Sequence, residues 1–157
     1  MTGKRDKIRI VTASARHAAL AAPLFDAYRQ FYRQPSDTRA ARMFLSQRLK
    51  RKESVLFLAF LDSKSRERPV GLVHLYPTFS SVSLRPQWIL NDLFVIPQAR
   101  RRGVAEALMN RARKLAKDTE ANALVLETAI DNFPAQRLYE RFGFKHETAF
   151  YHYALMI

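Results

Sequence analysis

Residues 95–105 read VIPQARRRGVA, and this stretch decides the expected fold more than any other. An apolar run stops at Pro97, a basic turn follows, and an apolar stripe with helical spacing begins after Gly103. The pattern predicts a buried strand, a turn and the start of an α-helix. The first N–H groups of a helix lack an acceptor within the helix, and the helix dipole is positive there. We therefore expect this turn to bind a phosphate, with Gly103 allowing close approach of the backbone.

Regular elements are expected on both sides of this turn. Strands are expected at residues 8–11, 55–61, 70–76, 88–96, 124–126 and 150–157, and helices at 15–32, 38–50, 104–117 and 133–142. A charged turn at 62–68 should join two of the strands into a hairpin. Strands and helices alternate in the second half, whereas two helices and a hairpin occupy the first, so we expect a mixed sheet with packed helices. A chain of 157 residues predicts a single domain, 1–157.

The composition excludes several classes of protein. There is no cysteine, which excludes disulfides, cysteine zinc sites and thiol nucleophiles. No apolar run approaches the ~20 residues that a membrane-spanning helix needs, and no apolar run follows the basic N-terminus as in a signal peptide. We therefore expect a cytoplasmic protein without a membrane partner. The 27 basic and 14 acidic residues give a net charge of +13, which favours phosphorylated ligands or other polyanions.

Two short motifs together resemble a known family. Arg100-x-x-Gly103-x-Ala105 resembles the R/Q-x-x-G-x-G/A signature of the GNAT acetyltransferases, and residues 132–144 resemble that family's N-x-x-A-x-x-L-Y-E-x-x-G-F segment. The resemblance implies an α/β (α+β) fold: a mixed, mostly antiparallel central sheet, helices on both faces and a splayed parallel strand pair. Residues 88–95 and 150–153 look like small GNAT proteins related to a fungal histone and polyamine acetyltransferase. The third small position of the first motif is Ala105 rather than glycine, which we expect binding to tolerate.

The resemblance also implies acetyl-CoA as co-substrate and a set of residues that contact it. These are Leu93, Phe94, Val95, Arg100, Arg101, Arg102, Gly103, Val104, Ala105, Asn132, Ala135 and Tyr139. In the family, the amides of the turn hold the pyrophosphate of coenzyme A, and the splayed central strand pairs with the pantetheine arm and the thioester oxygen. Asn132 could equally serve only as a helix N-cap.

Acetyl transfer to an amine needs a neutral amine, a donor for the oxyanion and a proton for the leaving thiolate. By its place in the second motif, Tyr139 is the candidate acid, although it also shares an apolar helical stripe and could be core. Asp92 lies inside an apolar strand, where an unpaired carboxylate is costly, so it should either be buried with a partner or line the cleft as amine anchor or base. Glu127 is the rival acid within a strand.

The acceptor cleft should contain aromatic and acidic side chains. The candidates are Tyr28, Phe31, Tyr32, Tyr76, Asp92 and Glu127. Aromatic rings suit a cationic amine, but the same rings could form ordinary core. The four histidines lack the spacing of metal ligands, so no metal is expected.

Three questions stay open at the level of sequence. The acceptor could be a small-molecule amine or an amine of a peptide or protein. A non-catalytic nucleic-acid-binding protein that keeps the GNAT fold is the competing hypothesis, although aromatics are not interleaved with the basic runs as stacking would need. The aromatic strand expected at 150–157 would form a sheet edge that needs a partner, which predicts a homodimer.

Overall fold

The structure, a computed structural model, describes residues 7–61 and 68–157. The chain divides into two compact units, one ending at Leu126 and one spanning Glu127–Ile157, and each is described by itself. Residues 62–67 of the charged turn expected at 62–68 lie outside the described residues. No helix of the described residues is long and apolar enough to cross a membrane.

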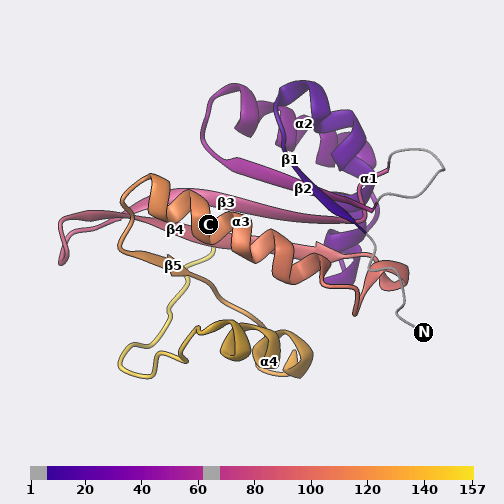
Figure 1. Cartoon of the computed structure of the whole chain (residues 1–157). Coiled ribbons are helices and arrows are strands. Elements are labelled where there is room, and N and C mark those ends of the chain that lie inside the picture. Colours follow the sequence, from indigo (N-terminus) through magenta and orange to yellow (C-terminus); the bar gives the residue numbers. More distant parts are fainter. Residues whose placement is uncertain (1–6, 62–67) are drawn as a thin grey trace, which may run out of the picture. The chain divides into compact units, whose positions relative to one another are not determined.

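The first unit contains a five-stranded sheet whose strands follow the order of the chain (Figure 1). The strands are β1 (Ile8–Thr12), β2 (Val55–Leu61), β3 (Gly71–Ser80), β4 (Arg85–Val95) and β5 (Ala123–Val125). The helices of this unit are α1 (Ala18–Phe31), α2 (Thr38–Lys50) and α3 (Val104–Asp118), with short 3₁₀ turns at Ala15–His17 and Pro97–Ala99. The first four strands pair antiparallel and β5 runs parallel to β4, which confirms the expected mixed, mostly antiparallel sheet.

Helices cover both faces of this sheet (Figure 1). On one face, alternate residues of β2, such as Leu56 and Leu58, form a core with α1 and α2, including Ala22 and Leu45. The intervening Phe57 points the other way, and the Arg111 guanidinium of α3 lies 4.4 Å from its ring centre. The strict alternation of a strand thus lets one buried run serve two helix layers.

Gly71 sets how closely α3 approaches the sheet. A Cβ at this position would lie 2.9 Å from Val104 Cγ1 and 3.1 Å from Leu108 Cδ1. A larger residue would therefore displace the first turns of α3 from β3. Because the arginine-rich turn immediately precedes α3, this contact also fixes where that turn lies relative to the end of β4.

The second unit contains one regular element, α4 (Phe133–Phe142). The side chain of Asn132 caps its start by accepting from the Ala135 amide, and Gly143 ends it with φ 108°, a left-handed conformation that favours glycine. These two residues explain why the expected bounds of this helix are confirmed. The structure also confirms the expected bounds of α2, whose first turn is capped by Asp37.

The strand expected at 150–157 is wrong, because these residues have no regular secondary structure. A strand is stable only when a neighbouring strand accepts and donates its backbone hydrogen bonds, and residues 127–157 contain no second strand. The side chains of Phe150, Tyr151 and Tyr153 are accordingly exposed. The homodimer stays a prediction, without the edge strand on which it rested.

Candidate active site

The turn before α3 has the backbone conformation of an anion-binding site. Arg101 and Gly103 both adopt positive φ, 60° and 83°. The first helical hydrogen bond of α3 is donated by Ala107 to the Gly103 carbonyl, so the amides that precede Ala107 have no acceptor within the helix. Left-handed residues next to a helix start turn successive N–H groups toward a common point, where an anion is stabilised by them and by the helix dipole.

The three arginines of the turn do not share one role. Arg100 folds back, and its Nε donates to the Val95 carbonyl over 3.0 Å, which ties the turn to the end of β4. Arg101 and Arg102 are exposed. The next residues of the motif enter the protein, since Val104 is buried and Ala105 is half-buried. The structure therefore uses Arg100 at least partly to hold the backbone, whereas Arg101 extends into solvent.

The edge of β4 that faces β5 is open over its last residues. The parallel pairing runs from Gln87–Ala123 to Ile89–Val125 and ends there, while β4 continues to Val95. On its other edge β4 stays paired with β3 as far as Val95. Within the described part of the chain, backbone groups of Leu93, Phe94 and Val95 on the β5 side consequently have no strand partner, which is the splayed pair that the GNAT resemblance implies.

Asp92 is buried with partners. Only 4% of it is exposed, and Oδ2 lies 3.1 Å from His74 Nδ1 while Oδ1 accepts from Asn91 Nδ2 over 2.9 Å. The other ring nitrogen of His74, Nε2, lies 2.7 Å from Ser54 Oγ. Of the two alternatives left open for Asp92, burial with a partner is therefore the one that the structure contains. Its role in chemistry stays a prediction.

Sequence reasoning missed His74 and Ser54. The buried polar residues of the described chain are Asp26, Ser54, His74 and Asp92. Two of these four, Ser54 and His74, are therefore the residues that were missed here. A signal was present, because an antiparallel hairpin of the two expected strands places His74 directly opposite Asp92. The pairing of a histidine with a strand carboxylate could have been read from that register.

Tyr76 adjoins the buried network of Ser54, His74 and Asp92. Its ring centre lies 4.8 Å from that of His74, and the residue is half-buried. Burial and, to a smaller extent, the negative charge of Asp92 raise the pKa of Tyr76 to about 12, although Arg48 acts in the opposite direction. Tyr76 therefore keeps its proton at neutral pH and remains available as a hydrogen-bond donor near Asp92.

The other predicted aromatic residues come together along α1. Tyr28 contacts Tyr32 edge to face at 5.2 Å between ring centres and Phe94 of β4 at 6.3 Å, and Phe31 contacts Tyr32 at 5.2 Å. Phe31 and Tyr32 are 55% and 42% exposed, so this group extends from the core to the surface. Phe94 and Asp92 are alternate residues of β4, which places the aromatic group beside the buried acid.

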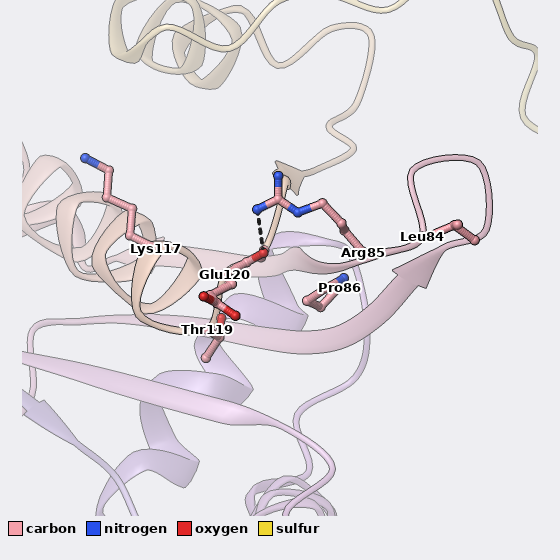
Figure 2. Close-up of a pocket in the computed structure, with 7 residues that line it drawn as sticks. Leu84, Arg85, Pro86, Lys117, Thr119 and Glu120 are labelled. Carbon is pink, nitrogen blue, oxygen red and sulfur yellow. Dashed lines mark hydrogen bonds between the residues drawn. The ribbon is translucent and has the colours of Figure 1, made fainter.

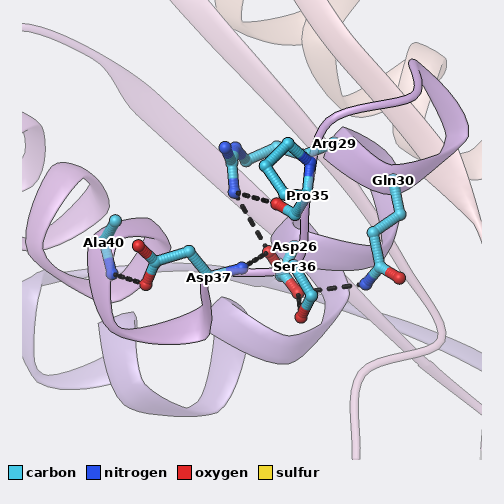
Figure 3. A network of polar contacts seen from close by, with 7 residues as sticks. All are labelled: Asp26, Arg29, Gln30, Pro35, Ser36, Asp37 and Ala40. Carbon is cyan, nitrogen blue, oxygen red and sulfur yellow. Dashed lines mark hydrogen bonds and ion pairs between the residues drawn. The ribbon is translucent and has the colours of Figure 1, made fainter.

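A second buried carboxylate, also missed from the sequence, fixes the end of this aromatic group. Asp26 of α1 is 2% exposed and accepts four hydrogen bonds, from Arg29 Nη1, Gln30 Nε2, Ser36 Oγ and the Asp37 amide (Figure 3). Burial alone would raise the pKa of Asp26. The bonds from Ser36, Asp37 and Arg29, with the charge of Arg29, together outweigh burial and lower it. The carboxylate thereby ties α1 to the start of α2.

The remaining predicted residues belong to the second unit. Tyr139 is half-buried in α4, and its ring contacts Phe144 at 5.8 Å, whereas Asn132 and Ala135 form the helix cap. Glu127 is exposed and lies 3.1 Å from His152 Nδ1. The expectation that Glu127 lies within a strand is wrong, because β5 ends at Val125.

A surface hollow occurs at the opposite end of β4 (Figure 2). It is lined by Leu84, Arg85, Pro86, Lys117, Thr119, Glu120 and Ala121. Arg85 Nη2 donates to the Glu120 carbonyl over 2.9 Å, so the side chain of Arg85 already has a hydrogen-bond partner within the hollow. None of the predicted site residues lines this hollow. Within residues 7–61 and 68–157, no group of three or more histidine and acidic side chains could hold a metal ion.

Comparison with known proteins identifies the family of the chain. The profile of the "Acetyltransferase (GNAT) family" matches residues 21–144. The "Uncharacterized N-acetyltransferase YhfO" of Bacillus subtilis (strain 168) is 43% identical over 150 residues, 96% of this chain and 98% of that protein.

Solved structures agree as well. The crystal structure of "a probable acetyltransferase" is 44% identical with a TM-score of 0.87, covering 95% of this chain and 97% of the other. An aminoglycoside N-acetyltransferase solved in complex with CoA shares the fold, at 17% identity and a TM-score of 0.79 with complete coverage of both chains. The chain belongs to the GNAT family and is an acetyl-CoA-dependent N-acetyltransferase.

Proposed function

We propose that the protein transfers the acetyl group of acetyl-CoA to a primary amine, of a small molecule or of a protein, by direct attack within a ternary complex. The observation that carries the proposal is the continuity of two backbone features. The open edge of β4 at 93–95 leads directly into the turn with left-handed Arg101 and Gly103. The first suits an extended pantetheine arm, and the second suits the pyrophosphate to which that arm is joined.

In this proposal the turn from Arg100 to Ala105 binds the pyrophosphate and the Leu93–Val95 backbone orients the thioester. Asn132 and Ala135, by their place in the second motif, contact the coenzyme as well. The amine's lone pair attacks the thioester carbon, the carbon–sulfur bond breaks, and the sulfur leaves as a thiolate. Tyr139 gives its hydroxyl proton to that thiolate and regains a proton from the nitrogen, which loses one as the amide forms, while backbone amides of β4 stabilise the oxyanion.

The amine must first lose a proton, because an ammonium has no lone pair. Asp92 is our candidate for anchoring the amine and for accepting this proton through water, and the exposed Glu127 is the rival acid. Tyr28, Phe31, Tyr32 and Tyr76 form the wall against which the amine binds. Rings that extend from core to surface beside a carboxylate support this assignment, since cations bind favourably over aromatic faces.

Two measurements test the proposal. Acetyl-CoA at a hundred times its dissociation constant should add about 2.7 kcal/mol of stability, a clear rise in melting temperature. Acetylation should then be assayed over polyamines, amino-sugar antibiotics, amino acids and basic peptides, with both substrates varied. Intersecting initial-rate patterns are expected for a ternary complex. Absence of any thermal shift with millimolar acetyl-CoA, or parallel patterns with an acetylated enzyme, would overturn it.

A further inference from the structure

Ser54, His74 and Asp92 form a buried hydrogen-bonded network with the connectivity of a serine-hydrolase triad, but its serine is not exposed to solvent as the serine of such a triad is. The residues before β2, in β3 and in β4 supply the three groups, with contacts of 2.7 and 3.1 Å. Ser54 is only 7% exposed and His74 is completely buried. Ser54 precedes β2, two strands away from the open edge of β4 where the thioester would lie, which argues against an acetylated serine and for a role exerted through Asp92.

The direction of the hydrogen bonds follows from the chemistry of the three groups. With Asp92 as a carboxylate, which only accepts, the proposal requires His74 to carry a hydrogen on Nδ1 and to donate it to Asp92 Oδ2. With a single hydrogen on the ring, Nε2 accepts a hydrogen bond from the Ser54 hydroxyl. Asn91 donates to the remaining oxygen, Oδ1. Two donors thus hold the Asp92 carboxylate, and a third group holds one of those donors.

The surroundings of His74 leave it few other roles. Phe25 of α1 packs edge to face on the ring at 6.0 Å, and Tyr76 of β3 lies on it at 4.8 Å. Asp92 and Arg48 of α2 are the charged groups that act on the neighbouring Tyr76, and Arg48 Nε lies 2.8 Å from Glu53 Oε2. Two aromatic contacts and a hydrogen bond at each ring nitrogen restrain rotation of the imidazole, which also restrains the carboxylate that it contacts.

We propose that His74 and Ser54 are positioning residues that hold the Asp92 carboxylate in one orientation toward the acceptor amine. The inference rests on the proposed function, because it needs Asp92 to act on the amine. The placement of Asp92 supports it. Asp92 lies beyond the last β4–β5 pair, in the open part of β4, two residues before Phe94 and opposite His74, whose ring contacts Tyr76. The His74 ring, itself hydrogen-bonded to Ser54, contacts one oxygen of this buried carboxylate, and Asn91 donates to the other.

The proposal predicts an epistatic pattern. Ser54→Ala and His74→Leu should each lower kcat/KM for the amine about ten- to a hundred-fold, the scale of a lost hydrogen bond to a charged group. Affinity for CoA should stay unchanged, and Ser54→Thr, which retains the hydroxyl, should restore most of the activity. In an Asp92→Asn background, Ser54→Ala and His74→Leu should cause little further loss, since they act through Asp92. Ser83→Ala, a matched change at the far end of the β3–β4 hairpin, should have no effect.

Other outcomes would overturn the inference. If the losses of kcat/KM in Ser54→Ala and His74→Leu add fully to that of Asp92→Asn, the Ser54–His74–Asp92 network is only part of the core. Equal losses in kcat/KM for the amine and in affinity for CoA would lead to the same conclusion. Acetylation of Ser54 seen by mass spectrometry would make it a nucleophile instead. Should the variants fail to fold, ¹⁵N NMR of the wild-type imidazole still decides: the Nδ1–H tautomer of His74 is expected, and the Nε2–H tautomer refutes the scheme. The NMR result is independent of activity, so a protein that acetylates no amine would refute the proposed function separately.

Discussion

Replacing Asp26 by asparagine tests the link between α1 and α2. The carboxylate accepts two hydrogen bonds at each oxygen: Arg29 and the Asp37 amide at Oδ1, Gln30 and Ser36 at Oδ2. Asparagine keeps the shape and one oxygen, but it presents an NH₂ group to two of the donors. Bonds to a charged acceptor contribute about 1.5–3 kcal/mol each, and some can rearrange, so we expect a loss of about 2–4 kcal/mol at pH 7.

The pH dependence of that loss gives the sharper test. The pKa of Asp26 is lowered in the folded protein from its ordinary value of 3.8. A lowered folded-state pKa means that the ionised carboxylate stabilises the fold above the unfolded-state value, and that this stabilisation disappears as the pH falls through the folded-state value. The difference in unfolding free energy between wild type and Asp26→Asn should therefore be constant from pH 7 to about 5 and shrink below about pH 4.

Urea denaturation of both proteins at each pH measures this difference. Asp118→Asn is the control, since Asp118 pairs with Lys114 on the exposed face of α3 and should contribute well under about 1 kcal/mol. Because the Asp26 network holds the junction that follows Phe31 and Tyr32 at the end of α1, KM for the amine should also rise in Asp26→Asn. A loss that is below about 0.5 kcal/mol at pH 7, or that is as large at pH 3 as at pH 7, would refute the reasoning.

Two further predictions concern the coenzyme. Asparagine tolerates the left-handed φ of 83° at Gly103, so Gly103→Asn should fold yet bind CoA at least about ten-fold more weakly. Gly143→Asn, a matched change at φ 108°, should bind CoA normally. If calorimetry shows equal CoA affinities for the two variants, the pyrophosphate does not bind at the turn. Gly103→Val adds backbone strain to the same loss and should melt at a lower temperature than Gly103→Asn. Tyr139→Phe should lower turnover about a hundred-fold, with little change in melting temperature or in KM for acetyl-CoA. Loss of stability with normal turnover would instead show that Tyr139 only packs in the core beside Phe144.

The sequence predicts secondary-structure elements best where it contains both an apolar periodicity and residues that mark the two ends of the element. The helix at 38–50 has an apolar face and a capping aspartate, and α4 has Asn132 before it and Gly143 after it, so their bounds are confirmed. The strand expected at 150–157 had a suitable composition but no local sign of a partner. Pairing is a tertiary property, and an aromatic, apolar segment without a neighbouring strand gains nothing from an extended conformation.

The candidate site divides in the same way. Asp92 is conspicuous in the sequence because a carboxylate in an apolar strand requires an explanation. Its partners His74 and Ser54 are not conspicuous, since the contacts span 18 residues and, from His74 to Ser54, a further 20. Asp26 resembles any polar residue of a surface helix, and its donors Ser36 and Asp37 follow 10 and 11 residues later, across a helix junction. Interactions between distant segments become visible only when register and helix packing are known.

The two buried carboxylates also bear on how a chain of net charge +13 could bind a cationic amine. A strongly positive surface favours the phosphates of acetyl-CoA and disfavours a cation, so the amine needs local negative charge that the surface does not supply. Asp26 and Asp92 are the buried acids of the described residues. Asp26 is occupied by four donors that hold a helix junction together, including a cationic arginine. The hydrogen-bond partners of Asp92 are instead Asn91 and His74, neither of which carries the permanent charge of an arginine. That difference is why Asp92, rather than Asp26, is the acid suited to an incoming ammonium.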